Sequence, residues 1–313
     1  MHEACPTARR YVVITPDMAT TVHHLRFSAV MRSGTDAQAT GRERRIRRYA
    51  RAPMGTQDPV ATPQTLRERA VDVANRVGEK LLRWLDRYFG RHSLVGDRTF
   101  FRVEQFPWVA RIEADWKAIR RELDEVLEYQ DELPNFQDIS TDQYQLTNDD
   151  KWKTFFFYGY GFTAGQNVER CPETVRLLQQ IPGMTTAMFS ILSPHKRIPP
   201  HGGPYKGVLR YHLALKVPEP ASSCGIRVGD DVREWEEGKS LVFDDTFEHE
   251  AWNETDGTRV VLFVDFKRPL RNPARLLNEA VLKLIGWSPF IQDAKARHNA
   301  WEKRFEEMRN RAA

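Results

Sequence analysis

Apolar side chains recur at three- and four-residue spacing from Gln64 to about Phe89, with Arg, Glu, Asp and Lys between them. This spacing predicts an amphipathic helix, and Gly90 is expected to end it. The helix has two interpretations. It packs against the main domain, or it lies on a membrane surface, because Trp84 and Tyr88 cluster at one end among arginines.

Further helical spacing appears on both sides of the middle of the chain. The pattern predicts a helix from Val109 to Tyr129 and a shorter one that begins at Pro172 and ends before Pro182. After Pro269 the apolar positions again follow helical spacing, and a charged tail follows them. Helices are therefore expected at both ends of the chain.

Short β-like segments fill the region between these helices, separated by Pro, Gly, Asn and Asp. Several short strands at this spacing are typical of an all-β sandwich or barrel, so the expected fold is mainly β with flanking α-helices. We expect an arm over 1–60, a helical leader over 61–130, a β domain over 131–270 and C-terminal helices over 271–313. The predicted strands are Thr185–Leu192, Val208–Val217, Gly225–Val228, Ser240–Asp245 and Arg259–Phe266.

Charge and cysteine content narrow the class of protein only a little. The 313 residues carry a formal net charge of +4, and part of the excess is an arginine cluster between residues 42 and 51. Such a cluster predicts a disordered basic arm or, as the alternative, a contact with anionic lipid headgroups or nucleic acid. Three cysteines give no disulfide framework and favour a reducing compartment.

No run of 18 apolar residues predicts a transmembrane helix, and the first 30 residues contain no continuous apolar segment typical of a secretory signal. The expected location is therefore cytoplasmic, with peripheral contact to the inner face of the membrane as an option. We expect no nucleic-acid partner.

The strand Val208–Val217 places two polar residues on one face. Because successive side chains of a strand point to opposite faces, Arg210 and His212 share a face, and Leu209 and Tyr211 lie on the other. The polar face is either exposed to solvent or lines the lumen of a barrel, where a buried arginine needs an anionic partner.

Two histidines are candidate metal ligands. His201 follows two prolines and precedes two glycines, which allow another group to approach the backbone closely. His249 lies where a predicted strand ends and turns. Two neutral imidazoles from neighbouring strands can hold Fe(II) and leave coordination positions open. Each histidine alone is more often structural, so the prediction depends on the pair.

Arg259 begins the last predicted strand on an otherwise apolar face. A guanidinium there suits a carboxylate ligand, because it binds a carboxylate through two parallel hydrogen bonds; an internal ion pair is the alternative. Tyr205 and the aromatic residues of Phe155–Tyr160 are candidates for a substrate wall, or otherwise for the aromatic core.

Taken together, these segments resemble the aspartyl/asparaginyl β-hydroxylase family. The resemblance extends from about Trp152 to Pro269 and rests on five motifs in order. They are His201-Gly-Gly-Pro-Tyr, Leu-Arg210-Tyr-His212-Leu, Trp235-Glu-Glu-Gly-Lys, Phe243-Asp-Asp-Thr-Phe-Glu-His249-Glu and Arg259.

The resemblance implies a double-stranded β-helix, a jelly roll of the cupin type, and an oxygenase that depends on Fe(II), 2-oxoglutarate and O₂, with ascorbate as an activator. It implies that His201 and His249 bind the iron. The distal carboxylate of 2-oxoglutarate would contact Arg259 and Ser190, and Arg210 and His212 would lie near its metal-chelating end, with Arg210 also counted as catalytic.

The substrate stays open at this point. Gly203 stands where many related oxygenases have a carboxylate ligand, which favours the branch that hydroxylates aspartyl or asparaginyl residues or a related amino acid and leaves that position to water or halide. Val208 stands where the animal protein hydroxylases have a basic residue, and the terminal helices resemble bacterial members, some of which act on lipids. The alternatives are a membrane-associated lipid A acyl-chain hydroxylase and a non-catalytic jelly-roll binding protein, so the partner is a small molecule, a peptide or a lipid.

Overall fold

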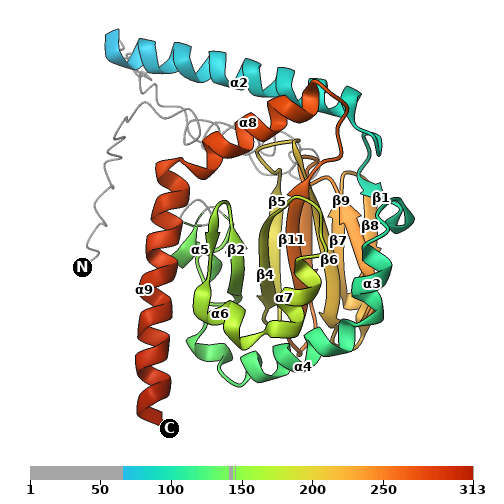
Figure 1. Ribbon diagram of the computed structural model, residues 1–313, viewed down its shortest axis with the longest axis vertical. Coiled ribbons are helices and arrows are strands. Elements are labelled where there is room, and N and C mark those ends of the chain that lie inside the picture. Colours follow the sequence, from blue (N-terminus) through green and yellow to red (C-terminus); the bar gives the residue numbers. More distant parts are fainter. Residues whose placement is uncertain (1–65, 141–143, 145, 313) are drawn as a thin grey trace, which may run out of the picture.

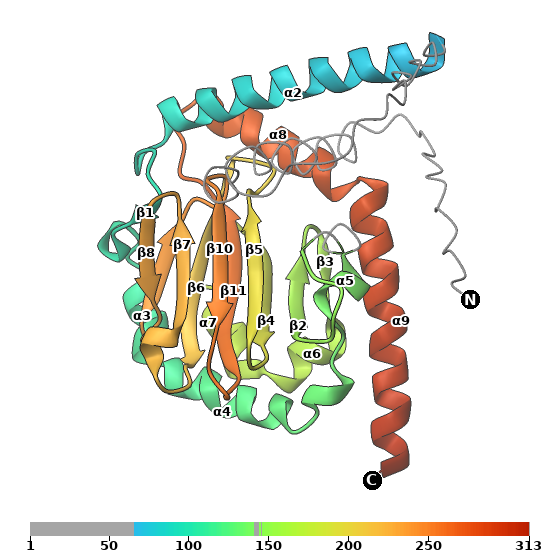
Figure 2. The same ribbon diagram turned by 180° about the vertical axis from the view of Figure 1, so that it is seen from behind.

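Two antiparallel β-sheets face each other in the computed structural model, which describes residues 66–140, 144 and 146–312 (Figures 1 and 2). The arm expected over 1–60 lies outside the described residues. The larger sheet has the strand order β1-β9-β6-β11-β4-β2-β3, and the smaller has the order β5-β10-β7-β8. The strands are β1 (Phe100–Phe101), β2 (Trp152–Gly159), β3 (Phe162–Thr163), β4 (Met184–Leu192), β5 (Lys196–His201), β6 (Val208–Lys216), β7 (Cys224–Val228), β8 (Asp231–Glu234), β9 (Ser240–Phe243), β10 (His249–Asn253) and β11 (Arg259–Lys267).

From β4 to β11 the chain passes back and forth between the two sheets, and only β7 and β8 follow each other within one sheet. Strands β4, β6, β9 and β11 belong to the larger sheet, and β5, β7, β8 and β10 belong to the smaller one. This winding is that of a double-stranded β-helix, so the mainly β jelly-roll prediction is confirmed. The space between the sheets contains apolar side chains from both, including Met188 and Val261 from the larger sheet and Ile226 and Ala251 from the smaller.

Strand β11 illustrates why the larger sheet has two different faces. Val260, Leu262 and Val264 pack toward the helices that cover the outside of the sheet. Val261 and Phe263 pack between the two sheets, on the same face as Arg259. The period-2 alternation of the strand therefore separates a purely apolar face from one that also has polar residues.

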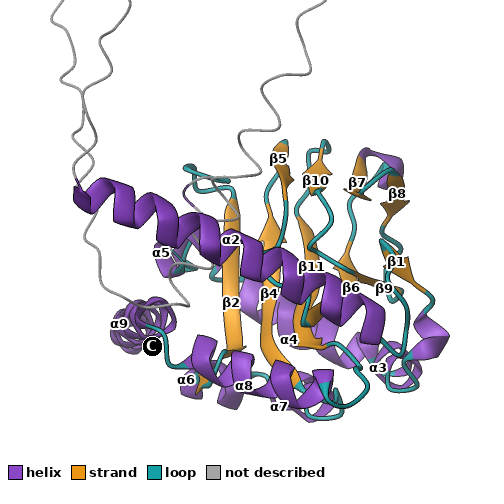
Figure 3. Cartoon of the chain, turned by 90° about the horizontal axis from the view of Figure 1, so that it is seen from above, coloured by secondary structure: helices purple, strands orange, loops and turns teal. Residues whose placement is uncertain are grey.

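A layer of helices covers the outer face of the larger sheet (Figure 3). The expected helix over Val109–Tyr129 is two helices, because the chain turns at Asp115. Helix α2 also continues beyond Gly90, the residue that was expected to end it. The helices are α2 (Leu66–His92), α3 (Val109–Ala114), α4 (Trp116–Leu127), α5 (Phe136–Ile139), α6 (Gly165–Arg170), α7 (Pro172–Leu178), α8 (Ala274–Gly286) and α9 (Pro289–Ala312).

Helices α2 and α8 lie together at one end of the molecule, and α9 extends along its side next to α5 (Figures 1 and 2). Leu85 and Phe89 of α2, Leu282 of α8 and Tyr205 form a small apolar cluster that joins the two helices to the loop after β5. No helix in the described part of the chain is both long enough and apolar enough to span a membrane.

Candidate active site

The two histidines predicted as metal ligands face each other across neighbouring strands. His201 is the last residue of β5 and His249 is the first of β10, and the two are register partners. Their ring centroids are 4.1 Å apart. Each Nδ1 lies at hydrogen-bond distance from the carbonyl oxygen two residues earlier, 2.8 Å to Pro199 and 3.0 Å to Phe247. These bonds favour a proton on Nδ1, which leaves the lone pair of Nε2 for a metal.

Both rings are neutral near neutral pH. Burial lowers the pKa of His201 well below its usual value, and electrostatic interactions with His249 and Arg210 lower it further. Burial, followed by Arg210, lowers the pKa of His249 to about 3. Neutral imidazole is the form that coordinates a metal, so the pair fits a divalent iron. Among the described residues, no third His, Cys, Asp or Glu completes a metal-binding group with them.

The side chain of Asp245 fills the space beside Gly203. A Cβ added at residue 203 would overlap the Asp245 carboxylate, and the Gly203 N–H donates to the Asp245 carbonyl oxygen at 2.6 Å. The Asp245 carboxylate, which comes from the β9–β10 loop, therefore lies where a side chain at residue 203 would begin. The glycine at 203 has a physical reason, because only a residue without a side chain leaves room for Asp245.

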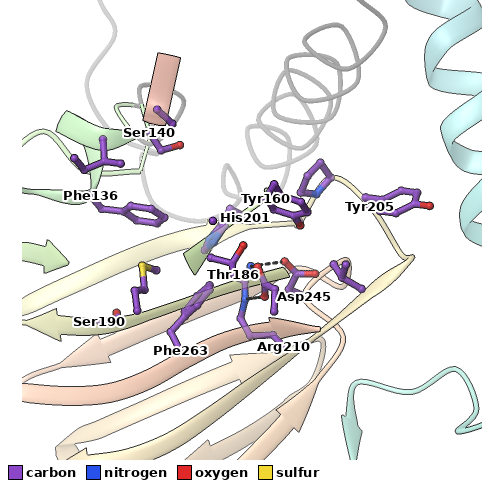
Figure 4. Close-up of a pocket in the computed structure, with 18 of the residues that line it drawn as sticks. Phe136, Ser140, Tyr160, Thr186, Ser190, His201, Tyr205, Arg210, Asp245 and Phe263 are labelled. Atoms are coloured by element: carbon purple, nitrogen blue, oxygen red, sulfur yellow. Dashed lines mark hydrogen bonds and ion pairs between the residues drawn. The ribbon is translucent and has the colours of Figure 1, made fainter. Parts of the chain in front are cut away.

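Arg210 is held by two carboxylates. Its Nη2 lies 2.9 Å from Asp245 Oδ2, and its Nε donates to Asp265 Oδ1 at 2.8 Å (Figure 4). Its guanidinium also stacks 4.2 Å from the ring centre of Phe263. The strand alternation predicted that Arg210 and His212 share a face, and of the two alternatives left open for that face the structure shows the one in which it lines the cavity. Within this arrangement, the charge of Arg210 is already balanced by protein groups.

Arg259 is in the opposite situation. It is 2% exposed, no ion pair joins it to a carboxylate in the described part of the chain, and its Nε and Nη1 have no hydrogen-bond partner there. The guanidinium lies 4.5 Å from the ring centre of Trp235. Burial lowers its pKa to about 10, so it remains a cation at neutral pH. A buried cation with unused donors fits an anionic ligand, and 2-oxoglutarate offers a carboxylate.

Ser190 and His212 border the same cavity. The Ser190 hydroxyl accepts a hydrogen bond from Trp152 Nε1 at 3.1 Å, which leaves its own proton free to be donated to a ligand. His212 is buried, and neither ring nitrogen has a hydrogen-bond partner among the described residues. Burial, with Arg210 and Arg259 next, lowers its pKa well below the usual value. The structure thus brings all six predicted site residues to one cavity.

That cavity has a volume of about 210 Å³ and is lined mainly by apolar side chains. Figure 4 shows Phe136 and Ser140 on one side of His201 and Tyr160 and Tyr205 on the other. The aromatic residues of Phe155–Tyr160 take both predicted roles, the aromatic core and the cavity wall. Phe155 and Phe157 belong to the core under the helices, whereas Phe156 and Tyr160 line the cavity, as Tyr205 does.

The C-terminal helices supply one wall that the sequence did not predict. Ile285 and Ser288 near the end of α8, and Phe290, Ile291 and Ala294 of α9, line the cavity. Asp245 and Asp265 were also missed. The only signal for Asp245 was its place in the motif before His249, and the spacing of β11 offered Asp265 as one more residue on the Arg259 face.

Comparisons with known proteins identify the family of the chain. The sequence model of the family described as aspartyl/asparaginyl beta-hydroxylase matches residues 113–269. The ornithine lipid ester-linked acyl 2-hydroxylase of Rhizobium tropici is 47% identical over 272 residues, which are 84% of this chain and 96% of that protein. Human aspartyl/asparaginyl beta-hydroxylase is 30% identical over 224 residues, and the match covers 64% of this chain but 29% of the human protein.

A solved prolyl-4-hydroxylase from Pseudomonas putida matches 51% of this chain and 98% of its own, with 13% identity and a TM-score of 0.34. The extent of the family match and the identity to the Rhizobium protein decide the assignment. The chain belongs to the aspartyl/asparaginyl β-hydroxylase family and is a hydroxylase.

Proposed function

We propose that this protein is an Fe(II)- and 2-oxoglutarate-dependent oxygenase that hydroxylates an ester-linked acyl chain of an ornithine lipid, at the carbon next to the ester carbonyl. The observation that carries the proposal is the apolar cavity that extends from the histidine pair to the C-terminal helices. The Rhizobium relative, whose name states this reaction, aligns over 96% of its length.

The predicted residues take separate roles in this proposal. His201 and His249 would hold the iron through Nε2, with their orientation set by the carbonyl groups of Pro199 and Phe247. Arg259 and Ser190 would bind the distal carboxylate of 2-oxoglutarate, which would satisfy the unused donors of Arg259. When bound, iron and 2-oxoglutarate supply the oxidising chemistry that converts a C–H bond into C–OH.

The remaining polar residues would orient the bound groups. His212 would lie beside the cosubstrate as a neutral ring. Arg210 would act by holding Asp245 next to Gly203, so that the carboxylate borders the metal position without closing it. The apolar walls would keep water away from the reacting carbon and restrict the motion of the chain.

A lipid substrate has better support than the aspartyl or asparaginyl residue that was the main expectation from the sequence. An acidic peptide side chain needs an unpaired cation in the substrate region. Arg210, which lines the cavity, is already paired with Asp245 and Asp265. Val208 is buried where the animal protein hydroxylases have a basic residue. An acyl chain requires only apolar walls, which Phe136, Phe156 and the α9 residues supply.

The test is product analysis. The purified protein, supplied with Fe(II), 2-oxoglutarate, ascorbate and O₂, is incubated in separate reactions with an ornithine lipid and with an aspartate-containing peptide. Mass spectrometry of the released fatty acid should show one added oxygen, and fragmentation should place it on carbon 2. Hydroxylation of the peptide with the lipid unchanged would refute the proposed substrate, and no product from either would refute the proposed reaction.

A further inference from the structure

Exposed apolar side chains gather on α2 and α8. These two helices lie together at one end of the molecule (Figures 1 and 2). At α8 they follow helical spacing, with Leu276 and Leu284 of the helix and Trp287 directly after it on one stripe, and Trp287 is 75% exposed. On α2, Leu81 and Trp84 are about half exposed, and the Trp84 ring stacks on Tyr88 at 5.1 Å. A folded protein rarely leaves such a group of large apolar side chains in water without a partner.

Basic side chains accompany these apolar ones. Lys80, Arg87 and Arg91 are exposed on α2, and Arg275 and Lys283 are exposed on α8. None of these five forms an ion pair within the part of the chain that the structure describes. A helix surface that combines Trp and Leu with unpaired Lys and Arg is typical of helices that lie in the interface of an anionic membrane.

The corner between α8 and α9 connects this surface to the cavity. Leu284 and Trp287 point outward, whereas their neighbours Ile285 and Ser288 line the cavity. Tyr160, another lining residue, approaches the same corner, because its carbonyl oxygen lies 3.3 Å from the position of a Cβ at Gly286. The exposed apolar stripe and the wall of the active-site cavity are therefore opposite sides of the same short segment.

The loop after His201 lies directly beneath α2 and α8. Tyr205, four residues after His201, packs edge-on against Phe89 of α2 with ring centroids 5.6 Å apart. Its hydroxyl donates to Asn278 of α8 at 2.6 Å. A membrane against the outer side of α2 and α8 would thus lie close to the histidine pair, with only this packed layer between them.

We propose that α2 and α8 form a docking surface for an anionic phospholipid bilayer, built from Leu81, Trp84, Leu276, Leu284 and Trp287 with the surrounding basic side chains. We further infer that the acyl chain reaches the cavity over the α8–α9 corner. The docking surface stands on exposure and charge alone. The acyl-chain route rests on the proposed function.

Sedimentation with vesicles tests the docking surface without iron, cosubstrate or turnover. The full chain should sediment with vesicles of phosphatidylcholine that contain about one third phosphatidylglycerol, and much less with phosphatidylcholine alone. The double variant Leu284→Glu/Trp287→Glu should weaken sedimentation about tenfold or more. The matched control is Val232→Glu, on the edge strand β8, where Val232 is also about half exposed. It should sediment like the wild type.

Arg87→Glu/Arg91→Glu gives a second, independent variant that leaves the apolar stripe intact and should lose sedimentation in low salt. Wild-type protein that stays in the supernatant with anionic vesicles would overturn the proposal, as would a Leu284→Glu/Trp287→Glu variant that sediments like the wild type. Thermal melting identifies a variant that fails to fold, and the other double variant then tests the docking surface.

Hydroxylation assays distinguish the proposed path of the acyl chain over the α8–α9 corner from the proposed lipid hydroxylation. The Leu284→Glu/Trp287→Glu variant should lose about tenfold more activity on ornithine lipid embedded in vesicles than on the same lipid dispersed in detergent. Equal loss in both would overturn the route over the corner. Absence of lipid hydroxylation by the wild type in both would refute the proposed function and leave the vesicle-binding result standing.

Discussion

Arg259 has a buried positive charge that no carboxylate of the described chain balances, so its presence should lower the stability of the protein without cosubstrate. Replacing it by methionine keeps an unbranched side chain that ends where the guanidinium begins, and it removes the charge. We therefore expect Arg259→Met to stabilise the protein that lacks 2-oxoglutarate and, in the same step, to abolish the binding of 2-oxoglutarate.

The size of the effect follows from the pKa of the group. Burial lowers the pKa of Arg259 from 12.5 to about 10, and a shift of this size corresponds to about 3 kcal/mol of unfavourable free energy for the charged form. The contact with the Trp235 ring, at 4.5 Å, is lost in the variant and is worth about 1 kcal/mol. The expected net gain in unfolding free energy is about 1–2 kcal/mol, within the range seen when buried charges are replaced by apolar groups.

The assay is urea unfolding of wild type and variant, each with and without 2-oxoglutarate. Cosubstrate at a hundred times its Kd should stabilise the wild type by about 2.7 kcal/mol and the variant not at all. A variant that is less stable than the wild type without 2-oxoglutarate would refute the argument that the charge is uncompensated. A variant that is still stabilised by 2-oxoglutarate would refute the assignment of Arg259 to the cosubstrate.

Three further predictions concern residues in or near the cavity. Gly203→Ala should lower the free energy of unfolding by about 3 kcal/mol, because it displaces the Asp245 carboxylate from its buried ion pair. In an Asp245→Ala background the same change should cost at least 1 kcal/mol less, as measured by chemical denaturation. Additive losses would contradict the overlap between residue 203 and Asp245. Ala294→Phe narrows the apolar part of the cavity and should raise KM about tenfold for long acyl chains and less for short ones. The assay uses lipids of graded chain length. An equal rise in KM for all lengths would argue against contact between the acyl chain and Ala294. Burial lowers the pKa of His298 to about 4, so the unfolded chain takes up the proton first, and the free energy of unfolding should fall as pH drops from about 6.5 through 4. His298→Phe should remove about 1–3 kcal/mol of this acid-induced loss of stability, measured by unfolding curves at several pH values. A variant with the same pH profile as the wild type would contradict this role of His298.

The site was predictable where a strand pattern or a motif specified it. The alternation along β6 separated Arg210 and His212 from Leu209 and Tyr211, and the structure has the first pair at the cavity and the second in the outer core. Alternation is a local property of the backbone, so it can be inferred without knowing the fold. It could not show which partner each arginine has.

Two strands that position the metal ligands escaped prediction for physical reasons. β5 contains Pro199 and Pro200, which weaken any strand signal, and the strand tolerates them because it lies at the edge of the smaller sheet. β10 is five residues long and begins with His249 and Glu250, so it shows little apolar alternation.

The cavity wall from α8 and α9 depends on contacts between segments far apart in the sequence. Helical spacing after Pro269 predicted the helices, but nothing in that spacing indicated that Ile285 and Ala294 would face a cavity more than 80 residues away from His201 in the chain. The proposal of a lipid substrate rests on that wall, and the sequence, which does not show the wall, left a peptide and a lipid as alternatives.

Release of succinate tests the central claim most directly. The iron-loaded protein is incubated with 2-oxoglutarate, ascorbate and O₂, with and without ornithine lipid, beside the variant His249→Ala. We predict succinate formation that requires iron, rises with the lipid and is absent from the variant. Succinate formation that ornithine lipid leaves unchanged and an aspartyl peptide increases, or that persists in His249→Ala, would contradict the account.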